Sequence, residues 1–220
     1  RIEVLQPLSV EVPSTGLPAA RTVLRIDSVS FSHEAGRAVI ADLSFDIVGP
    51  ERVAVVGPNG AGKTTLLGLV EGRLVPQRGS VEVLTDLAVL DQQVGLLDPS
   101  RSIHENFRRL NPHSADNACR AALARFMFRA DAALQVVSSL SCGQLLRAGL
   151  ACVLGVKPPS LLILDEPTNH LDLDSIEAVE AGLRAYDGAL LVVSHDEVFL
   201  DSIGITRRLE LAGSAPLQAE

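Results

Sequence analysis

One short loop constrains the fold of this chain more than any other feature of its sequence. Residues 57–64, GPNGAGKT, fit the pattern G-x-x-x-x-G-K-[ST], after the apolar run Val53–Val56 and before a segment that can start a helix. The glycines allow positive φ and expose consecutive N–H groups, and a helix N-terminus adds its positive end. Lys63 can reach the terminal phosphates of a nucleotide, and the Thr64 hydroxyl can bind Mg²⁺. The loop therefore predicts a phosphate-binding site.

Three segments are apolar at every position, namely Val53–Val56, Leu161–Leu164 and Leu190–Val193. A strand that is apolar on both faces is typical of a covered, parallel sheet. Residues 175–186 lie between the last two segments and have apolar side chains at helical spacing. This alternation predicts βαβ units with right-handed crossovers.

The chain on either side of this core differs in character. Residues 1–21 contain three prolines and no periodicity, which predicts a linker. Residues 28–31 and 43–47 alternate apolar and polar side chains, as half-buried antiparallel strands do. Small residues from Leu209 onward predict an exposed tail, and we place its start at residue 212.

A helical insertion is predicted at about residues 93–157. Helical apolar spacing covers residues 102–110 and 116–128, and a further helix is expected at about residues 145–154. Six arginines gather in this part of an otherwise acidic chain, and we expect either a solvated helix face or a contact surface for an anionic partner. They are Arg101, Arg108, Arg109, Arg120, Arg125 and Arg129.

Functional side chains follow the buried strands. Asp165 and Glu166 end one strand, and parallel strands present such groups at the sheet edge beside the phosphate loop. Asp165 is placed to hold the Mg²⁺ shell and Glu166 to polarise an attacking water. His195 follows another strand and can contact the terminal phosphate or the water. Gln92 or its neighbour Gln93 can reach the metal ion or the water, and the sequence leaves that choice open.

Two helix starts carry capping signals. Ser141 fits an N-cap with Gln144 three residues later, as in a capping box, and Asp174 or Ser175 is expected to cap the helix over residues 175–186. Ser141 and Gln144 also fit an anion-binding helix end. If the helical insertion separates them from Lys63, they need a second copy of the domain to act on a nucleotide.

Composition excludes several classes of protein. The 220 residues are 47% hydrophobic and 21% charged, which argues against a mostly disordered chain, and the apolar runs are too short to cross a bilayer. A net charge of −8 disfavours non-specific attraction to nucleic acid. Three cysteines without a CxxC pair favour a reducing cytosol over a disulfide framework or a zinc site. Since the chain begins with Arg1, we expect it to be part of a longer protein.

Six segments, in order and at similar spacing, resemble the motifs of the ATP-binding-cassette (ABC) ATPases over about residues 22–211. In this comparison Gly57–Thr65 is similar to Walker A, Gln92 to the Q-loop, Leu140–Gln144 to the signature, Leu161–Glu166 to Walker B, Asn169–Asp172 to the D-loop, and His195 to the switch histidine.

The resemblance implies an α/β fold, a P-loop NTPase of ABC type. This fold has a mainly parallel sheet core, an antiparallel β subdomain and a small inserted helical subdomain. It also implies binding and hydrolysis of ATP with Mg²⁺, with Glu166, His195 and Gln92 as catalytic residues and Thr64, Gln92 and Asp165 as metal ligands. The implied nucleotide-binding residues are His33, Gly57, Asn59, Gly60, Ala61, Gly62, Lys63, Thr64, Thr65, Ser141, Gly143 and Gln144.

Within the family, residues 165–172, DEPTNHLD, and residues 146–151, LRAGLA, resemble the ABC-F subgroup of soluble proteins with two cassettes and no membrane domain. The proline-containing N-terminal segment is similar to the linker before a second cassette. The resemblance implies a second ABC cassette as partner, in the same chain or in a homodimer. It further implies the ribosome and its rRNA as partners, a cytoplasmic location and no direct membrane insertion.

Two residues depart from the family pattern. Cys142 stands where the signature usually has its first glycine, so we expect its side chain to crowd the loop and to weaken hydrolysis at the partner's site. His33 occupies the place of the aromatic residue that stacks on adenine, and its ring offers a smaller stacking surface.

Two other functions compete with the ABC-F interpretation. An ATPase subunit of an ABC transporter would use the same catalytic residues, but its helical insertion would bind a membrane partner. A non-catalytic module would bind ATP as a structural ligand, which the presence of Lys63, Asp165, Glu166 and His195 disfavours. Small-molecule P-loop kinases lack the signature element and are more distant.

Overall fold

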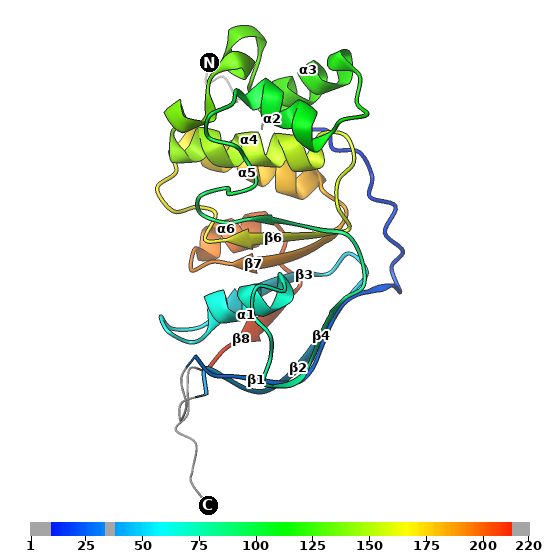
Figure 1. Ribbon diagram of the computed structural model, residues 1–220, viewed down its shortest axis with the longest axis vertical. Helices are drawn as coiled ribbons and strands as arrows, with labels where there is room; N and C mark the ends of the chain where they lie inside the picture. The colour runs from blue at the N-terminus through cyan, green and yellow to red at the C-terminus, as the bar shows by residue number, and fades with distance from the viewer. Residues whose placement is uncertain (1–9, 34–37, 213–220) are drawn as a thin grey trace, which may run out of the picture.

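The strands that the sequence marks as apolar on both faces lie side by side in one sheet. The computed structural model describes residues 10–33 and 38–212 (Figure 1). The sheet is parallel throughout, with the strand order β5-β6-β7-β3-β8, so the predicted parallel core is confirmed. Its strands are β3 (Arg52–Val56), β5 (Leu87–Leu90), β6 (Leu161–Asp165), β7 (Ala189–Val193) and β8 (Arg207–Glu210).

A second, three-stranded antiparallel sheet contains β1 (Thr22–Phe31), β2 (Ile40–Val48) and β4 (Arg78–Val83) in the order β2-β1-β4. The two alternating segments of the sequence lie in β1 and β2, so their antiparallel pairing is confirmed, whereas β4 was not predicted. Helix α1 (Lys63–Val70) lies between the two sheets (Figure 1).

The central strands face two hydrophobic cores because neighbouring residues point to opposite faces of a sheet. Val53 and Val55 of β3 pack in the core that α1 and the antiparallel sheet share. Ala54, between them, packs in the core that the helices on the other face form. The phosphate loop follows β3 and is therefore anchored at the centre of the molecule.

The helices of the predicted insertion lie between β5 and β6 in the chain and form one end of the molecule (Figure 1). Helices α5 (Leu173–Ala185) and α6 (Glu197–Ser202) follow β6 and β7. Among the described residues, no helix combines the length and apolar character needed to span a bilayer. The inserted elements are α2 (Ile103–Leu110), α3 (Asp116–Arg125), the 3₁₀ helices η1 (Ala130–Leu134) and η2 (Val137–Ser139), and α4 (Cys142–Leu154).

Three local predictions were wrong. Helix α3 ends at Arg125 rather than near residue 128, and Met127 takes a positive φ of 71° beyond it. Helix α5 is capped by Asp172, whose carboxylate accepts a hydrogen bond from Ser175 N at 2.7 Å, not by Asp174 or Ser175. Leu209 belongs to β8, which pairs with β3, so the chain is still in the sheet at that residue.

Most of the arginines of the insertion have partners within it. Arg101 and Arg120 form ion pairs with Asp98 and Asp116. Arg108, Arg109 and Arg125 donate hydrogen bonds to backbone carbonyls, those of Ser114, Leu96 and Gly155. These contacts within the insertion favour the first of the two expectations, a solvated helix face, over a contact surface for an anionic partner.

The described part of the predicted linker, residues 10–21, contains no helix or strand but packs along the body of the protein (Figure 1). Val10 is buried in the core of the helical side, and Leu17 packs against the core on the side of the antiparallel sheet. Between them, Ser14 and Thr15 donate hydrogen bonds to the Asp187 carboxylate at 2.5 and 2.8 Å. Residues 1–9 of this segment and 213–220 of the predicted tail lie outside the described residues.

Candidate nucleotide site

The loop between β3 and α1 needs glycine where it turns. Gly57 has a φ of 148° and Gly62 a φ of 96°, both in the region that favours glycine. A Cβ at Gly62 would also lie 3.0 Å from Val39 Cγ1, so the loop packs tightly against the segment before β2. The sequence pattern of glycines thus follows from backbone geometry and close packing.

The N-terminus of α1 has no side chain that caps its first N–H groups. Gly62 is its N-cap and provides no side-chain hydrogen bond, whereas Ser102, Ser141, Asp172 and Asp196 cap α2, α4, α5 and α6. The first N–H groups of a helix need a partner, and an anion is a suitable one. The uncapped end of α1 therefore fits a phosphate group.

Lys63 is held close to this loop. Its ammonium group donates hydrogen bonds to Gly57 O at 2.7 Å and to Pro58 O at 3.1 Å, and the residue is only 9% exposed. These bonds fix the position of the cation at the mouth of the loop. A positive charge at this place adds to the dipole of α1, so both favour the same anion.

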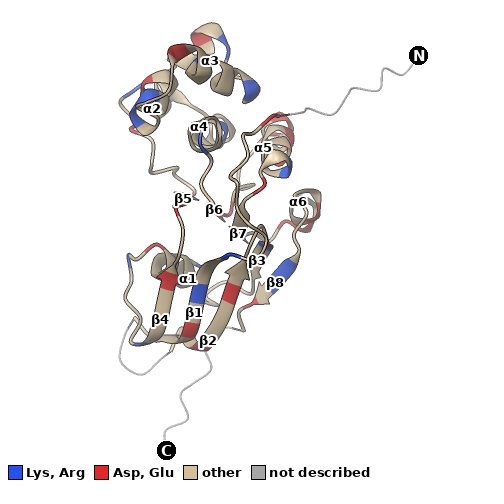
Figure 2. Cartoon of the chain, turned by 90° about the vertical axis from the view of Figure 1, so that its right-hand side faces the viewer, with Lys and Arg blue, Asp and Glu red and all other residues tan. Residues whose placement is uncertain are grey.

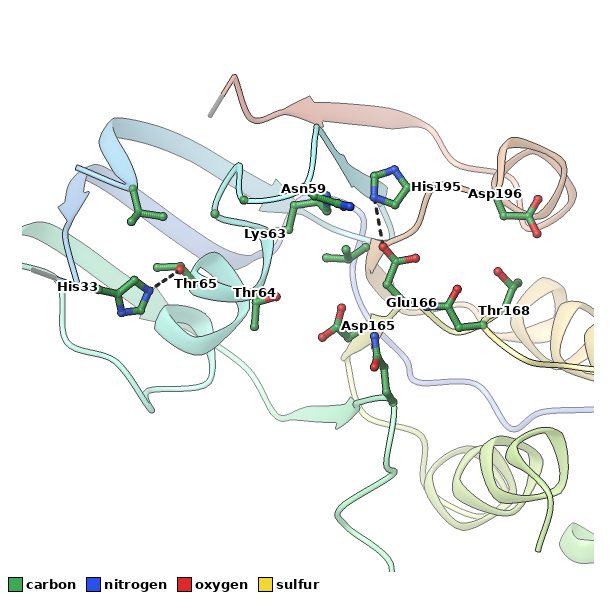
Figure 3. A pocket seen from close by; sticks show the side chains of 16 residues that line it. His33, Asn59, Lys63, Thr64, Thr65, Asp165, Glu166, Thr168, His195 and Asp196 are labelled. Carbon is green, nitrogen blue, oxygen red and sulfur yellow. Dashed lines mark hydrogen bonds and ion pairs between the residues drawn. The ribbon is translucent and has the colours of Figure 1, made fainter. Parts of the chain in front are cut away.

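Two strand ends bring Asp165, Glu166 and His195 together. Asp165 is the last residue of β6, and Glu166 N donates to Val193 O of β7 at 2.8 Å. Glu166 has a φ of 48°, which turns the chain at this point, and its Oε1 lies 3.4 Å from His195 Nε2. The two carboxylates therefore take different positions, one beside the loop and one beside the histidine (Figure 3).

The charge around Asp165 suits a cation. Burial raises the pKa of the Asp165 carboxyl, and the carboxylates of Glu166, Asp91 and Glu71 raise it further, while Arg73 lowers it. A bound divalent cation would relieve this repulsion between carboxylates. The chemistry of the residues thus fits Mg²⁺ together with a triphosphate.

These groups line one cavity of about 830 Å³. A cavity of this size holds a ligand of the dimensions of a nucleotide. The cavity brings together the carboxyl edge of the parallel sheet, the phosphate loop and the end of β1 (Figure 3). The predicted site residues that line it are His33, Asn59, Gly60, Gly62, Lys63, Thr64, Thr65, Gln92, Asp165, Glu166 and His195.

Other residues of the wall were absent from the predicted site. Thr168 and Asn169 follow Glu166 in the chain, and Asp196 follows His195, so proximity in sequence was a usable signal for them. Val39 and Val193 gave no signal, because only the packing of the loop and the strand ends places them here. Gly57 and Ala61 belong to the loop but not to the lining, since Gly57 O accepts from Lys63 and Ala61 is buried.

The structure distinguishes Gln92 from Gln93 and places His33 in the cavity. Gln92 lines the cavity, whereas Gln93 lines only a smaller hollow of about 200 Å³ beside it. The His33 ring packs edge-on against Phe31, with 5.0 Å between ring centroids, and its Nε2 lies 3.1 Å from Thr65 Oγ1. His33 is thus held beside the start of α1, and its role in stacking on adenine stays a prediction.

The predicted signature residues lie elsewhere. Ser141 and Gln144 form the capping box that their spacing predicts, with bonds of 3.0 and 3.2 Å at the start of α4. Neither residue lines the large cavity, and nor does Gly143. The exposed Cys142 instead lines the smaller hollow beside Asn169 and Leu171. The two hollows share Gln92, Asp165 and Glu166, so the start of α4 lies beside the large cavity but contributes no side chain to its lining.

Comparison with known proteins agrees with this architecture. Residues 40–169 match the family model described as ABC transporter. Over 87% of its own length, this chain is 39% identical to the ATP-binding protein YdiF of Bacillus subtilis. Over 85% of its own length, it is 36% identical to ABC transporter F family member 3 of Arabidopsis thaliana. It also superposes on an inward-facing structure of a metal-chelate type ABC transporter with a TM-score of 0.72 at 24% identity, over 89% of this chain and 84% of that one.

The chain is also 35% identical to the Uup-like ATP-binding protein of Haemophilus influenzae, of which it covers 45%. It covers 30% of YdiF and 26% of the Arabidopsis protein, so all three relatives are longer than this chain. The similarity therefore concerns only part of each relative. The open helix end, the acidic strand end and the family match lead to one assignment: the chain belongs to the ABC transporter family and is an ABC ATPase cassette similar to those of ABC-F proteins.

Proposed function

We propose that this cassette binds Mg-ATP and hydrolyses it at a composite interface with a second ABC cassette. One observation carries the proposal. A single cavity holds Lys63 and Asp165, while the signature residues around Gly143 lie outside it. The cavity therefore offers groups suited to binding and cleaving a triphosphate, but it lacks the helix end on which the signature residues lie.

In this mechanism the chain mainly positions the reactants and stabilises charge. The uncapped N-terminus of α1 and Lys63 bind the phosphates, and Thr64, Asp165 and Gln92 are the side chains that would hold Mg²⁺. When bound there, Mg²⁺ would neutralise negative charge on the phosphates of the nucleotide.

Glu166 is the proposed general base. It accepts a proton as water attacks the γ-phosphorus, while the bond to the β-phosphate oxygen breaks and ADP leaves. His195, 3.4 Å from Glu166, orients the water and contacts the γ-phosphate. Ser141, Gly143 and Gln144 complete the site of the facing cassette, which is either in the same polypeptide or in a second copy.

Glu166→Gln tests the role of the base. The substitution keeps the size of the side chain but removes the proton acceptor. We therefore expect an unchanged affinity for Mg-ATP and a turnover reduced by a factor of about a hundred or more. Turnover and equilibrium binding of a fluorescent ATP analogue measure the two quantities. Full turnover in Glu166→Gln would remove Glu166 from this role.

The composite site makes a separate prediction for the isolated chain. Because half of each site is missing in a monomer, we expect slow hydrolysis whose specific activity rises with chain concentration. Fast turnover that is independent of concentration would contradict the shared site.

We further propose that the full-length protein acts on the ribosome in the cytoplasm, with hydrolysis controlling its release. The similarity to ABC transporter F family member 3 and to the Uup proteins supports this proposal. Co-sedimentation of the full-length Glu166→Gln variant with ribosomes in the presence of ATP tests it. Co-purification with membranes instead would favour a transporter subunit.

A further inference from the structure

The first turns of α4 and α5 pack directly on one another. Gly143 is buried in the first turn of α4, and a Cβ at this position would lie 2.5 Å from Ser175 Cβ and closer still to Ser175 Oγ. The next neighbour of such a Cβ would be Leu171, at 3.7 Å from its Cδ2. Real Cβ atoms do not approach other atoms so closely, so the contact requires glycine on one helix and a small side chain on the other.

Ser175 contributes size rather than hydrogen bonding to this contact. The residue is 0% exposed, and in the described part of the chain its Oγ has no hydrogen-bond partner. A buried hydroxyl without a partner costs stability. The backbone N–H of Ser175 has a partner, the carboxylate of Asp172, which caps α5. The Ser175 side chain is therefore just small enough to pack against Gly143.

A second contact lies one turn further along α4. The Arg147 guanidinium lies over the Phe128 ring at 5.3 Å, and its Nε is buried without a hydrogen-bond partner among the described residues. Burial lowers the pKa of Arg147, and the nearby carboxylates of Asp172 and Asp174 raise it. Two carboxylates at the start of α5 are thus close enough to attract a cation on α4, in addition to the packing of Gly143 on Ser175.

We infer that Ser175 is a positioning residue for the composite site. By packing on Gly143 it holds the signature turn, residues 141–144, and the D-loop, residues 169–172, as one rigid unit. Both segments then reach the facing cassette in a fixed relative position. The inference rests on the hydrolysis at a shared interface proposed above, and it assigns a role to a residue outside the known motifs.

The local structure supports a rigid unit. The capping box of Ser141 and Gln144 fixes the first turn of α4, and Asp172 fixes that of α5. The contact between Gly143 and Ser175 then removes the remaining freedom between two turns that are each already ordered. A misplacement of about 1 Å can lower a rate about a hundredfold, so a small side-chain change at this contact has a measurable effect.

Ser175→Val tests the inference, with Ser175→Ala as its matched control, in the full-length protein with its facing cassette. Valine replaces the hydroxyl with a methyl group and adds a second methyl group at a fully buried position, so we expect kcat to fall about tenfold or more, with KM and ATP affinity within about twofold of the wild type. Alanine removes only the unpaired hydroxyl, so we expect kcat within about twofold of the wild type.

A structural measurement makes the test independent of activity. Cys142 is exposed beside Gly143, whereas Cys119 and Cys152 are buried, so the rate of maleimide labelling at Cys142 reports on the first turn of α4. We expect Ser175→Val to change this rate and Ser175→Ala to leave it unchanged. If Ser175→Val does not fold, Ser175→Thr, which adds one methyl group and keeps the hydroxyl, takes its place.

The outcomes separate the inference from the proposed function. Equal kcat and equal labelling rates in Ser175→Val and Ser175→Ala would overturn the positioning role. So would a parallel loss of ATP affinity and kcat in Ser175→Val, because that pattern indicates general disruption of the fold. A wild-type protein without ATPase activity would refute the proposed function, and the labelling rates would still decide whether the contact sets the position of the turn.

Discussion

At the scale of single residues, Lys63 shows how the loop is prepared for an anion. Its ammonium group is bonded to two backbone carbonyls of the loop, those of Gly57 and Pro58, and is thereby held in one place. A cation that is already positioned loses little conformational entropy when a phosphate binds. Lys63 therefore contributes to affinity through both charge and preorganisation.

Lys63→Ala should weaken ATP binding about ten- to hundredfold, because a hydrogen bond to a charged group is worth about 1.5–3 kcal/mol. Isothermal titration calorimetry with Mg-ATP measures the change. Lys157, the chain's other lysine, is exposed and lies outside the cavity, so Lys157→Ala is the control and should bind as the wild type does. Equal affinities for both variants would contradict the phosphate-binding role of Lys63.

Sequence reasoning reached most residues of the cavity because their chemistry is local. A lysine in a glycine-rich loop, or carboxylates after a buried strand, can be identified from neighbouring residues alone. The choice between Gln92 and Gln93 could not be made in this way, because it depends on how the chain turns after β5. Ser175 was expected only as a helix cap, since its contact with Gly143 arises from packing between two helices.

At the scale of elements, Tyr186 joins the end of α5 to the start of β7. The side chain is 1% exposed, and its hydroxyl donates to Pro159 O at 2.7 Å, with Ala189 O 3.2 Å away. Burial raises the pKa of Tyr186, so the phenol stays protonated and remains a donor. Its backbone carbonyl also accepts a hydrogen bond from Arg52 on β3.

Tyr186→Phe should therefore lower the free energy of unfolding by about 1–3 kcal/mol, because the carbonyls that face the hydroxyl stay buried and lose their donor. Urea unfolding followed by circular dichroism measures the loss. Tyr186 is not part of the cavity, so the ATP affinity of the folded variant should equal that of the wild type. An unchanged free energy of unfolding would mean that water replaces the donor.

The elements differ in how well the sequence predicted them, and burial explains the difference. Strands β3, β6 and β7 are buried on both faces and were found from their unbroken apolar runs. Strand β8, Arg-Arg-Leu-Glu, lies at the edge of the sheet and is mostly exposed, so its sequence carries no strand pattern. The helix starts at Ser141 and Asp172 are both capped, but only the first has a capping-box spacing that identifies it.

At the scale of the whole molecule, residues 10–21 connect parts that are distant in the chain. They contact the core of the helical side through Val10, the turn before β7 through Asp187, and the antiparallel sheet through the bond from Gly49 N to Arg21 O. The segment thus spans both cores, along one side of the molecule (Figure 2). Its position depends on the Asp187 carboxylate, because Ser14 and Thr15 lie midway along it.

Asp187→Ala should loosen this segment, because it removes the acceptor of both hydrogen bonds. We expect amide hydrogen exchange at Thr15 to become about two- to tenfold faster, with Asp187→Asn intermediate, since its carbonyl still accepts one bond. Asp131→Ala, at an exposed position on η1, is the control and should not change the exchange.

The same contact makes the segment sensitive to acid. Burial raises the pKa of Asp187, but the hydrogen bonds from Ser14 and Thr15 outweigh it, and the pKa lies below its ordinary value. Its stabilising effect is therefore complete above the ordinary value of about 3.9 and is lost as the pH falls through the lowered pKa. Once intrinsic exchange is accounted for, Thr15 in the wild type should approach its rate in Asp187→Ala only below about pH 4. A difference between the two proteins that already vanishes at neutral pH would show that Asp187 does not hold the segment.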